Sequence, residues 1–256
     1  MTSQFDCAGA TLAEVMVDAG DDRWRVAGVP LENRRRIVIA FVGMAFEARI
    51  AKGPGVLVVC RSADRALATV AESAVRQGYR GMISFGVAGG LNAGLRAGDW
   101  VVASEVLESQ STRATDAAWS NKLLGMIAGA VHAPIVGVDA PVAEPAKKRE
   151  LHRTTGAAAV DMESHVVARL AAAHGLACAA VRVIVDPVDR AVPPAALLAM
   201  RPDGRADVKG VLRDLMARPS QLSPLARIAV DAFSARAEML RVRRLLGPHF
   251  GLVDLA

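Results

Sequence analysis

The sequence predicts an α/β fold: a three-layer α/β/α arrangement around a mixed, largely parallel central sheet. Two observations carry this prediction. Short apolar runs rich in β-branched residues recur along the chain, and segments with helical periodicity lie between several of them. Strands and helices that alternate in this way build a parallel sheet with helices on both faces. The composition, 52% hydrophobic and 22% charged, is that of a globular chain.

The first expected strand covers residues 37–42 (Ile-Val-Ile-Ala-Phe-Val), a continuous apolar run suited to burial on both faces. Similar runs predict strands at 56–60, 82–85, 100–104, 135–138 and 179–185. Helical patterns between them predict helices at 63–77, 114–131 and 163–174. Because no internal repeat or low-complexity linker separates these elements, we expect one catalytic domain over residues 37–200, preceded by an N-terminal extension of residues 1–36.

Residues 201–256 are expected to form a basic, helical C-terminal extension of the same domain. Turn chemistry at Arg201-Pro202-Asp203-Gly204 is followed by helical patterns at 206–217 and 225–246. The apolar residues of the second pattern share one stripe of the helix: Leu225, Ile228, Ala229, Ala232, Phe233, Met239 and Leu240. Two interpretations stay open, a helix docked on the domain with a solvated basic face and a helix that contacts a membrane surface.

Composition and charge exclude several classes of function. No apolar run reaches the ~20 residues that span a bilayer, and the N-terminus lacks the pattern of a secretory signal. The three cysteines (Cys7, Cys60 and Cys178) and the five histidines show no metal-ligand spacing, so neither a metal nor a resident cofactor is expected. The net charge of +5 is not interleaved with aromatic residues, which argues against nucleic acid as a partner. We expect a cytoplasmic protein, peripheral on the inner membrane face if 225–246 binds lipid.

Two segments place candidate residues after the first and third expected strands. Glu47, in Gly43-Met44-Ala45-Phe46-Glu47, lies where open α/β sheets hold catalytic carboxylates. The alternative is a Glu in a first helical turn, favoured by the helix dipole. The glycines of 86–91 (Gly-Val-Ala-Gly-Gly-Leu) would let backbone N–H groups approach a ligand. A tight turn at the strand end explains the same glycines.

Two further segments carry acids. Asp161-Met162-Glu163 precedes the helix expected at 163–174, and a carboxylate there would accept hydrogen bonds from a vicinal diol such as the ribose hydroxyls. Helix capping by Asp161 is the alternative. Asp186 lies at the end of the strand at 179–185 and is followed by Pro187, so an ordinary helix N-cap is the better explanation of this residue taken alone. The basic run 147–149 (Lys-Lys-Arg) is expected on a solvated helix face.

Together, the order and placement of these segments resemble the nucleoside phosphorylase superfamily over roughly residues 37–200, and its adenine-nucleosidase branch in particular. The resemblance implies that Glu47 positions or deprotonates the attacking water and that Asp186 protonates adenine N7. It implies that Met162 packs on the sugar while Glu163 holds its hydroxyls. It implies a homodimer and further substrate contacts from this set: Met44, Gly86, Val87, Ala88 and Gly89.

Several positions depart from that pattern. Phosphorylases with a strong phosphate site tend to have Arg and Ser near the Gly-rich segment, where this chain has Ser84 and Val87. The possible phosphate-binding residues are Ser84 and, in place of the missing charge, Arg49 or Arg61, so phosphate as a co-substrate is an open question. Val185 stands where the nucleosidases usually have Ser, which removes a hydrogen bond that would orient Asp186.

Other segments are similar to the hopanoid-associated phosphorylases: 43–51, 186–190, 193–197 and the Arg/Leu-rich tail. That resemblance implies removal of adenine from a 5′-substituted adenosine, namely conversion of adenosylhopane to a ribosylated or phosphoribosylated hopane in hopanoid biosynthesis. One alternative is a methylthioadenosine/S-adenosylhomocysteine nucleosidase. An alternative of another class is a nucleoside-binding module without turnover.

Overall fold

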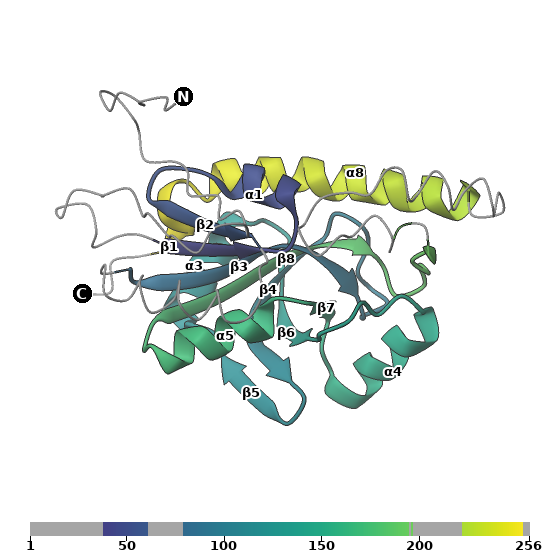
Figure 1. Ribbon diagram of the computed structural model, residues 1–256, viewed down its shortest axis with the longest axis horizontal. Coiled ribbons are helices and arrows are strands. Elements are labelled where there is room, and N and C mark those ends of the chain that lie inside the picture. The colour runs from purple at the N-terminus through teal and green to yellow at the C-terminus, as the bar shows by residue number, and fades with distance from the viewer. Residues whose placement is uncertain (1–37, 61–78, 195, 197–221, 253–256) are drawn as a thin grey trace, which may run out of the picture.

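The computed structural model describes residues 38–60, 79–194, 196 and 222–252, and its centre is one eight-stranded sheet (Figure 1). The strands are β1 (Val38–Val42), β2 (Val56–Cys60), β3 (Gly81–Gly90), β4 (Trp100–Glu108), β5 (Ser111–Ala114), β6 (Val131–Gly137), β7 (Ala159–Asp161) and β8 (Ala177–Asp186). Their order is β2-β1-β3-β7-β6-β4-β5, and β8 pairs with both β3 and β4.

The pairing of β8 closes part of the sheet into a ring. β3 pairs with β7 and β8, β8 with β4, β4 with β6, and β6 with β7. Register shifts interrupt two of these pairings, that of β3 with β8 between Ala88 and Gly89 and that of β4 with β6 between Ala103 and Val106. Such bulges bend strands and increase their twist. Since β1, β3 and β8 run parallel, their carboxyl ends meet at one edge.

Helices cover both faces of this sheet, as the sequence predicts. The helices are α1 (Ala45–Ala51), α3 (Ala117–Met126), α4 (Pro145–Thr155), α5 (Ser164–Ala173), α8 (Leu222–Leu245) and the short η3 (Pro248–Gly251). Successive side chains of a strand point to opposite faces. Ile39 and Phe41 of β1 accordingly join the apolar cluster under α5, whereas Val38 and Ala40 join the one under α1, α3 and α8. Figure 1 shows α1 and α8 on one side of the sheet and α5 on the other.

Most expected strands are present, although several are longer than the apolar runs that predict them. β2 has the predicted bounds, while β3 continues through the glycines to Gly90. The helix predicted at 114–131 is shorter because β5 ends at Ala114 and Gly129, with a φ of 79°, precedes β6. The predictions do not include the short strands β5 and β7. They anticipate α1 only as the alternative for Glu47, and α4 only as the solvated helix face expected at 147–149. The extension 1–36 and the helices expected at 63–77 and 206–217 lie outside the described residues.

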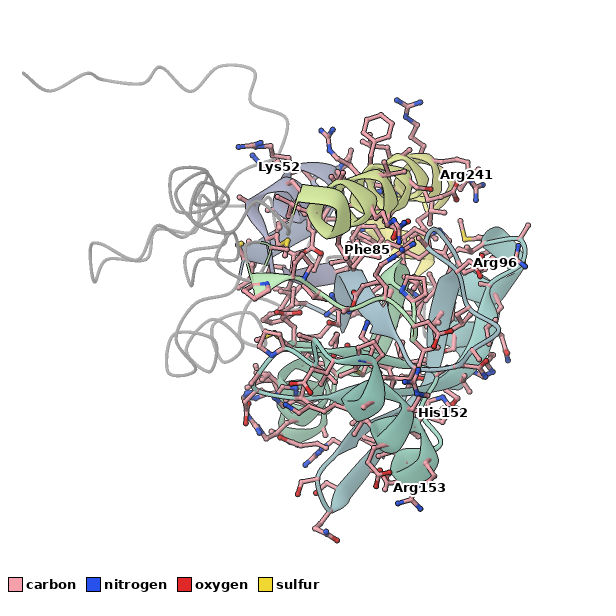
Figure 2. The ribbon with its side chains drawn as sticks, turned by 90° about the vertical axis from the view of Figure 1, so that its right-hand side faces the viewer. Lys52, Phe85, Arg96, His152, Arg153 and Arg241 are labelled. Atoms are coloured by element: carbon pink, nitrogen blue, oxygen red, sulfur yellow. The ribbon has the colours of Figure 1, made fainter. Side chains whose placement is uncertain are left out.

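Helix α8 docks on the sheet with one face and exposes another. Ala235, Met239 and Val242 are fully buried on it, whereas Val230 is 69% and Phe233 73% exposed. The docked face therefore differs from the predicted stripe, which includes Phe233. Figure 2 shows Arg241 on the outer side of α8 and Phe85 in the interior beneath it. Among the described helices, none combines the length and apolar character needed to cross a bilayer. Contact of 225–246 with a membrane surface stays a prediction.

The C-terminal segment is held to the sheet through Phe250. Its ring is fully buried, meets Phe85 edge-on at 5.0 Å between centroids, and lies 4.4 Å from the Arg243 guanidinium carbon. Its carbonyl oxygen accepts a hydrogen bond of 2.9 Å from the Trp119 indole N–H of α3. This residue therefore couples η3, α3, α8 and β3.

We expect the Phe250→Ala substitution to lower the free energy of unfolding by about 3–5 kcal/mol, because it removes a buried ring and leaves a cavity. Urea denaturation followed by circular dichroism measures the change. Phe233→Ala is the matched control: its ring is 73% exposed, so its effect should stay within about 0.5 kcal/mol. Equal losses in the two variants would contradict this account of the docking.

Candidate active site

The candidate residues gather where β1, β3 and β8 end. Glu47 is in the first turn of α1, directly after β1, and Asp186 is the last residue of β8. In the β3–β8 register Gly86 is opposite Arg182 and Gly89 is opposite Asp186. Three residues of strand separate the two positions, a distance of roughly 10 Å. This edge of an open α/β sheet is where ligands bind.

The carboxylate of Glu47 is fully enclosed by backbone donors. Its Oε2 accepts hydrogen bonds of 2.8 Å from the N–H groups of both Gly43 and Met44, and its Oε1 accepts one of 2.7 Å from Val87 of β3. Glu47 thus caps α1, as the first-turn interpretation predicts, and also bridges to the Gly-rich strand; its catalytic role stays a prediction. Burial raises the pKa of Glu47, and the nearby Arg182 opposes that rise.

Arg182 of β8 lies fully buried at the centre of the cluster. Its guanidinium forms an ion pair with Asp161 and donates a hydrogen bond to the Ser84 hydroxyl. The same guanidinium lies 3.3 Å from Glu163 Oε2. Burial lowers the pKa of Arg182, but the surrounding carboxylates, Asp161 first, raise it beyond that effect. Arg182 is therefore a permanent cation shared among three acids.

Asp161 and Glu163 make different contacts, and those of Asp161 are with the start of α5. Asp161, the last residue of β7, accepts hydrogen bonds from the Ser164 N–H at 3.1 Å and the Ser164 hydroxyl at 2.5 Å, so it does cap α5. Glu163 is the N-cap residue of α5, but its side chain reaches toward Arg182 and the loop after β1. A Cβ on Gly43 would lie 2.7 Å from Glu163 Oε1.

Asp186 lies beside Gly89 of β3. A Cβ on Gly89 would be 3.2 Å from Asp186 Oδ2, and the same oxygen lies 2.5 Å from Nζ of Lys148 in α4. Burial raises the pKa of Asp186, and Lys148 opposes the rise. The chain after Asp186 makes a turn, with a hydrogen bond of 2.8 Å from the Arg190 N–H to the Pro187 carbonyl. The N-cap explanation of Asp186 is therefore wrong, because no helix begins there.

The remaining predicted residues are two methionines, Ser84 and two arginines. Met44 is the half-buried N-cap residue of α1, and Met162 is half-buried between β7 and α5. Ser84 is fully buried and holds Arg182. The structure does not bring Arg49 into the cluster, because it is exposed and two residues from Glu47, on the opposite side of α1. Arg61 lies outside the described residues.

Two functional candidates, Arg182 and Lys148, were missed by the sequence reasoning. The signal for Arg182 is a charged residue inside an apolar strand run, Val181-Arg182-Val183, which requires a buried partner. Lys148 gives no comparable signal, and the expected solvated face is wrong for it: its side chain is 0% exposed, against 67% for Lys147. In the part of the chain that the structure describes, no group of His, Cys, Asp and Glu is arranged to hold a metal ion.

Residues 26–222 match the phosphorylase superfamily. The chain belongs to this family. No match was found among curated protein sequences. Solved structures with the same fold include futalosine hydrolase of Helicobacter pylori, with 17% identity and a TM-score of 0.55 over 71% of this chain and 99% of that one. The 5′-methylthioadenosine/S-adenosylhomocysteine nucleosidase of the same organism gives 17% identity and a TM-score of 0.56, over 71% and 98%.

A third similar structure is the nucleosidase of the same type from Colwellia psychrerythraea, in complex with adenine. It has 16% identity and a TM-score of 0.54, over 71% of this chain and 95% of that one. These likenesses establish the nucleoside phosphorylase/nucleosidase fold that the sequence predicts.

The position of Gly86 yields a test of the site's geometry. A Cβ there would lie 2.4 Å from Glu47 Oε1 and 2.5 Å from Arg182 Nη1, too close for either group to stay in place. We expect Gly86→Ala to lower stability by about 1–3 kcal/mol through overpacking, measured by thermal denaturation. Gly125→Ala in α3, where nothing lies within 4 Å, should stabilise by up to about 1 kcal/mol. An undiminished melting temperature for Gly86→Ala would show that Glu47 and Arg182 do not meet at this strand.

Proposed function

We propose that this protein cleaves the N-glycosidic bond of a 5′-substituted adenosine and releases adenine. One observation carries the proposal: two buried acids, Glu47 and Asp186, flank the same glycine strand at the ligand-binding edge of the sheet. Their positions along β3 are roughly 10 Å apart. A purine nucleoside can bridge that span with a hydrogen bond at each end.

In the proposed reaction Asp186 is the general acid. Adenine is a poor leaving group as an anion, so the protonated carboxyl of Asp186 donates its proton to N7 while the C1′–N9 electron pair moves to the base. Burial raises the pKa of Asp186, which favours the protonated form that this role needs. Glu163 accepts hydrogen bonds from the ribose hydroxyls, and Met162 packs on the sugar.

Glu47 serves the nucleophile on the other side of C1′. Water attacks C1′ and passes a proton to the Glu47 carboxylate, so that the products are adenine and a 5′-substituted ribose. The raised pKa of Glu47 makes it a stronger base than an exposed Glu. Three backbone N–H groups hold its carboxylate in place before the reaction, so little reorganisation is needed.

The charge of the cluster favours water over phosphate as the nucleophile. Three carboxylates surround the Arg182 guanidinium: those of Glu47, Asp161 and Glu163. This negative surplus stabilises the positive charge that develops on the ribose in the transition state. It also repels a phosphate dianion. The two phosphate candidates that the structure describes offer no compensation, because Ser84 is bonded to Arg182 and Arg49 faces solvent.

The 5′ substituent is the finer part of the proposal. The sequence resemblance favours adenosylhopane as the substrate, and the exposed apolar residues of α8, Val230 and Phe233, are consistent with a lipid substrate. The second candidate is methylthioadenosine or S-adenosylhomocysteine, which the structural likeness to nucleosidases of that name favours. A nucleoside-binding module without turnover, the alternative from another class, would bind adenine but form no product.

Replacing the acid tests the assignment of Asp186. We expect Asp186→Asn to lower the rate of adenine release by about 10²–10⁴-fold, the usual contribution of a general acid, while the fold is retained by circular dichroism. Adenine is measured by liquid chromatography. Asp189→Asn is the matched control, since Asp189 is 80% exposed and pairs with Arg149 at the surface; it should keep the parent rate. Turnover of Asp186→Asn at the parent rate would rule Asp186 out as the acid.

The nucleophile and the substituent are tested together by product analysis. The protein is incubated with adenosylhopane or methylthioadenosine, with and without phosphate, in water enriched in oxygen-18. We expect adenine release without phosphate and a free sugar product that carries the heavy oxygen at C1, detected by mass spectrometry. A sugar 1-phosphate would show phosphorolysis instead. A clear preference for methylthioadenosine would show that the smaller nucleoside, and not adenosylhopane, is the substrate.

A further inference from the structure

Lys148 occupies an unusual position for a lysine. It belongs to a basic run on α4 in which its neighbours are solvated: the side chain of Lys147 is 67% exposed and that of Arg149 is 58% exposed. Lys148 itself is 0% exposed. Burying an ammonium costs several kcal/mol unless charged and polar partners replace the lost water. Its position therefore requires a dedicated set of oxygen partners.

All of these partners belong to one short segment, the turn that follows β8. The Lys148 ammonium donates to Asp186 Oδ2 at 2.5 Å and to three carbonyl oxygens, those of Asp186 at 2.9 Å, Arg190 at 3.0 Å and Pro187 at 3.2 Å. An ammonium has three protons, so these four oxygens more than saturate it, and at least one proton is shared between two of them. The Lys148 side chain is thus fixed against Asp186, the residue that acts as the acid in the proposed function.

The turn is fixed from the other side as well. Arg190 donates a hydrogen bond of 2.8 Å to Asp231 of α8, so α4 and α8 both contact the turn at residues 186–190. Gly89 of β3 lies against Asp186 Oδ2. Because Lys148 engages Oδ2, the proposal assigns Oδ1 to the ligand.

We propose that Lys148 is a positioning residue for Asp186: it holds one carboxyl oxygen, directs the other toward the leaving group, and stabilises the carboxylate that remains after proton transfer. This inference rests on the proposed function. The step is balanced: the Oδ1 proton moves to N7, the C1′–N9 pair moves to adenine, and Asp186 is left as an anion beside the Lys148 cation. Lys148 keeps its own protons throughout.

The contact between Lys148 and Asp186 sets the direction in which the pH dependence of kcat should change when the lysine is removed. The charged groups that act on Asp186 in the described structure are Lys148 of α4, Asp231 of α8, and Arg190, which is paired with Asp231. Lys148 lowers the pKa of Asp186, whereas burial and Asp231 raise it. Removing the lysine charge therefore raises that pKa. Because Asp186 acts while protonated, the alkaline limb of the kcat profile moves to higher pH.

The experiment compares Lys148→Met with the surface control Lys147→Met in the full chain. Two readouts are taken: kcat for adenine release against pH, and the titration of the Asp186 carboxyl carbon by NMR, assigned by its loss in Asp186→Asn. We expect Lys148→Met to lose about 10²-fold in kcat near neutral pH, as misplacement of a catalytic group does. Its alkaline limb and its Asp186 titration should both move to higher pH. Lys147→Met should match the parent protein in both.

The two readouts separate this inference from the proposed function. If the parent protein releases no adenine, the proposed function is wrong, and the titration still reports whether Lys148 governs Asp186. An Asp186 titration that is identical in the parent and in Lys148→Met overturns the inference, as does a rate loss with an unmoved alkaline limb, which a merely structural pin would give. If Lys148→Met does not fold, Lys148→Ala with added ethylammonium replaces it. Rescue of kcat by the amine, but not by ethanol, supports the inference, and no rescue overturns it.

Discussion

A guanidinium buried away from solvent must find its polar and charged partners inside the protein, and Arg182 finds one hydroxyl and three carboxylates on four different elements. Ser84 comes from β3, Asp161 from β7, Glu163 from the start of α5, and Glu47 from α1. Removing one partner of a buried ion pair typically costs 3–5 kcal/mol. The geometry of the candidate site is therefore tied to the stability of the sheet itself, because the residue that orders the acids lies in the middle of a core strand.

The two carboxyl groups of the site, those of Glu47 and Asp186, lie in different surroundings. These surroundings suit one to act as a base and the other as an acid in the proposed function. Burial raises the pKa of both. Glu47 is then surrounded by fixed N–H dipoles, which favour its ionised form. Asp186 instead contacts the ammonium group of Lys148. Three backbone carbonyl groups hold this ordinarily flexible side chain in place. Pairs of titratable groups placed in contrasting environments are a recurring basis for acid and base assignments.

Much of this arrangement follows from the sequence, and the remainder has identifiable physical reasons. The apolar runs locate most strands because burial on both faces leaves a continuous pattern. β7 is missed because it has three residues. In α4 the burial of Lys148 is missed because its neighbours in sequence are exposed basic residues. Glu47, Glu163 and Asp186 can be named from their places after strand ends. Arg182 and Lys148 act through contacts across 19 to 98 residues of chain, including Arg182 with Ser84 and Lys148 with Asp186, and local patterns do not report such contacts.

The ring formed by β3, β7, β6, β4 and β8 has a consequence for motion at the site. Both edges of β3 and of β8 are hydrogen-bonded to neighbours: β3 to β8 on one side and to β1 and β7 on the other, and β8 to β3 and β4. A strand with both edges engaged cannot slip in register or peel away without breaking two ladders. Within the described sheet, β2 and β5 are the end strands, so local opening is easiest there. The backbone amides around Arg182, where β8 pairs with β3 and β4 at once, are therefore protected from solvent exchange by two ladders.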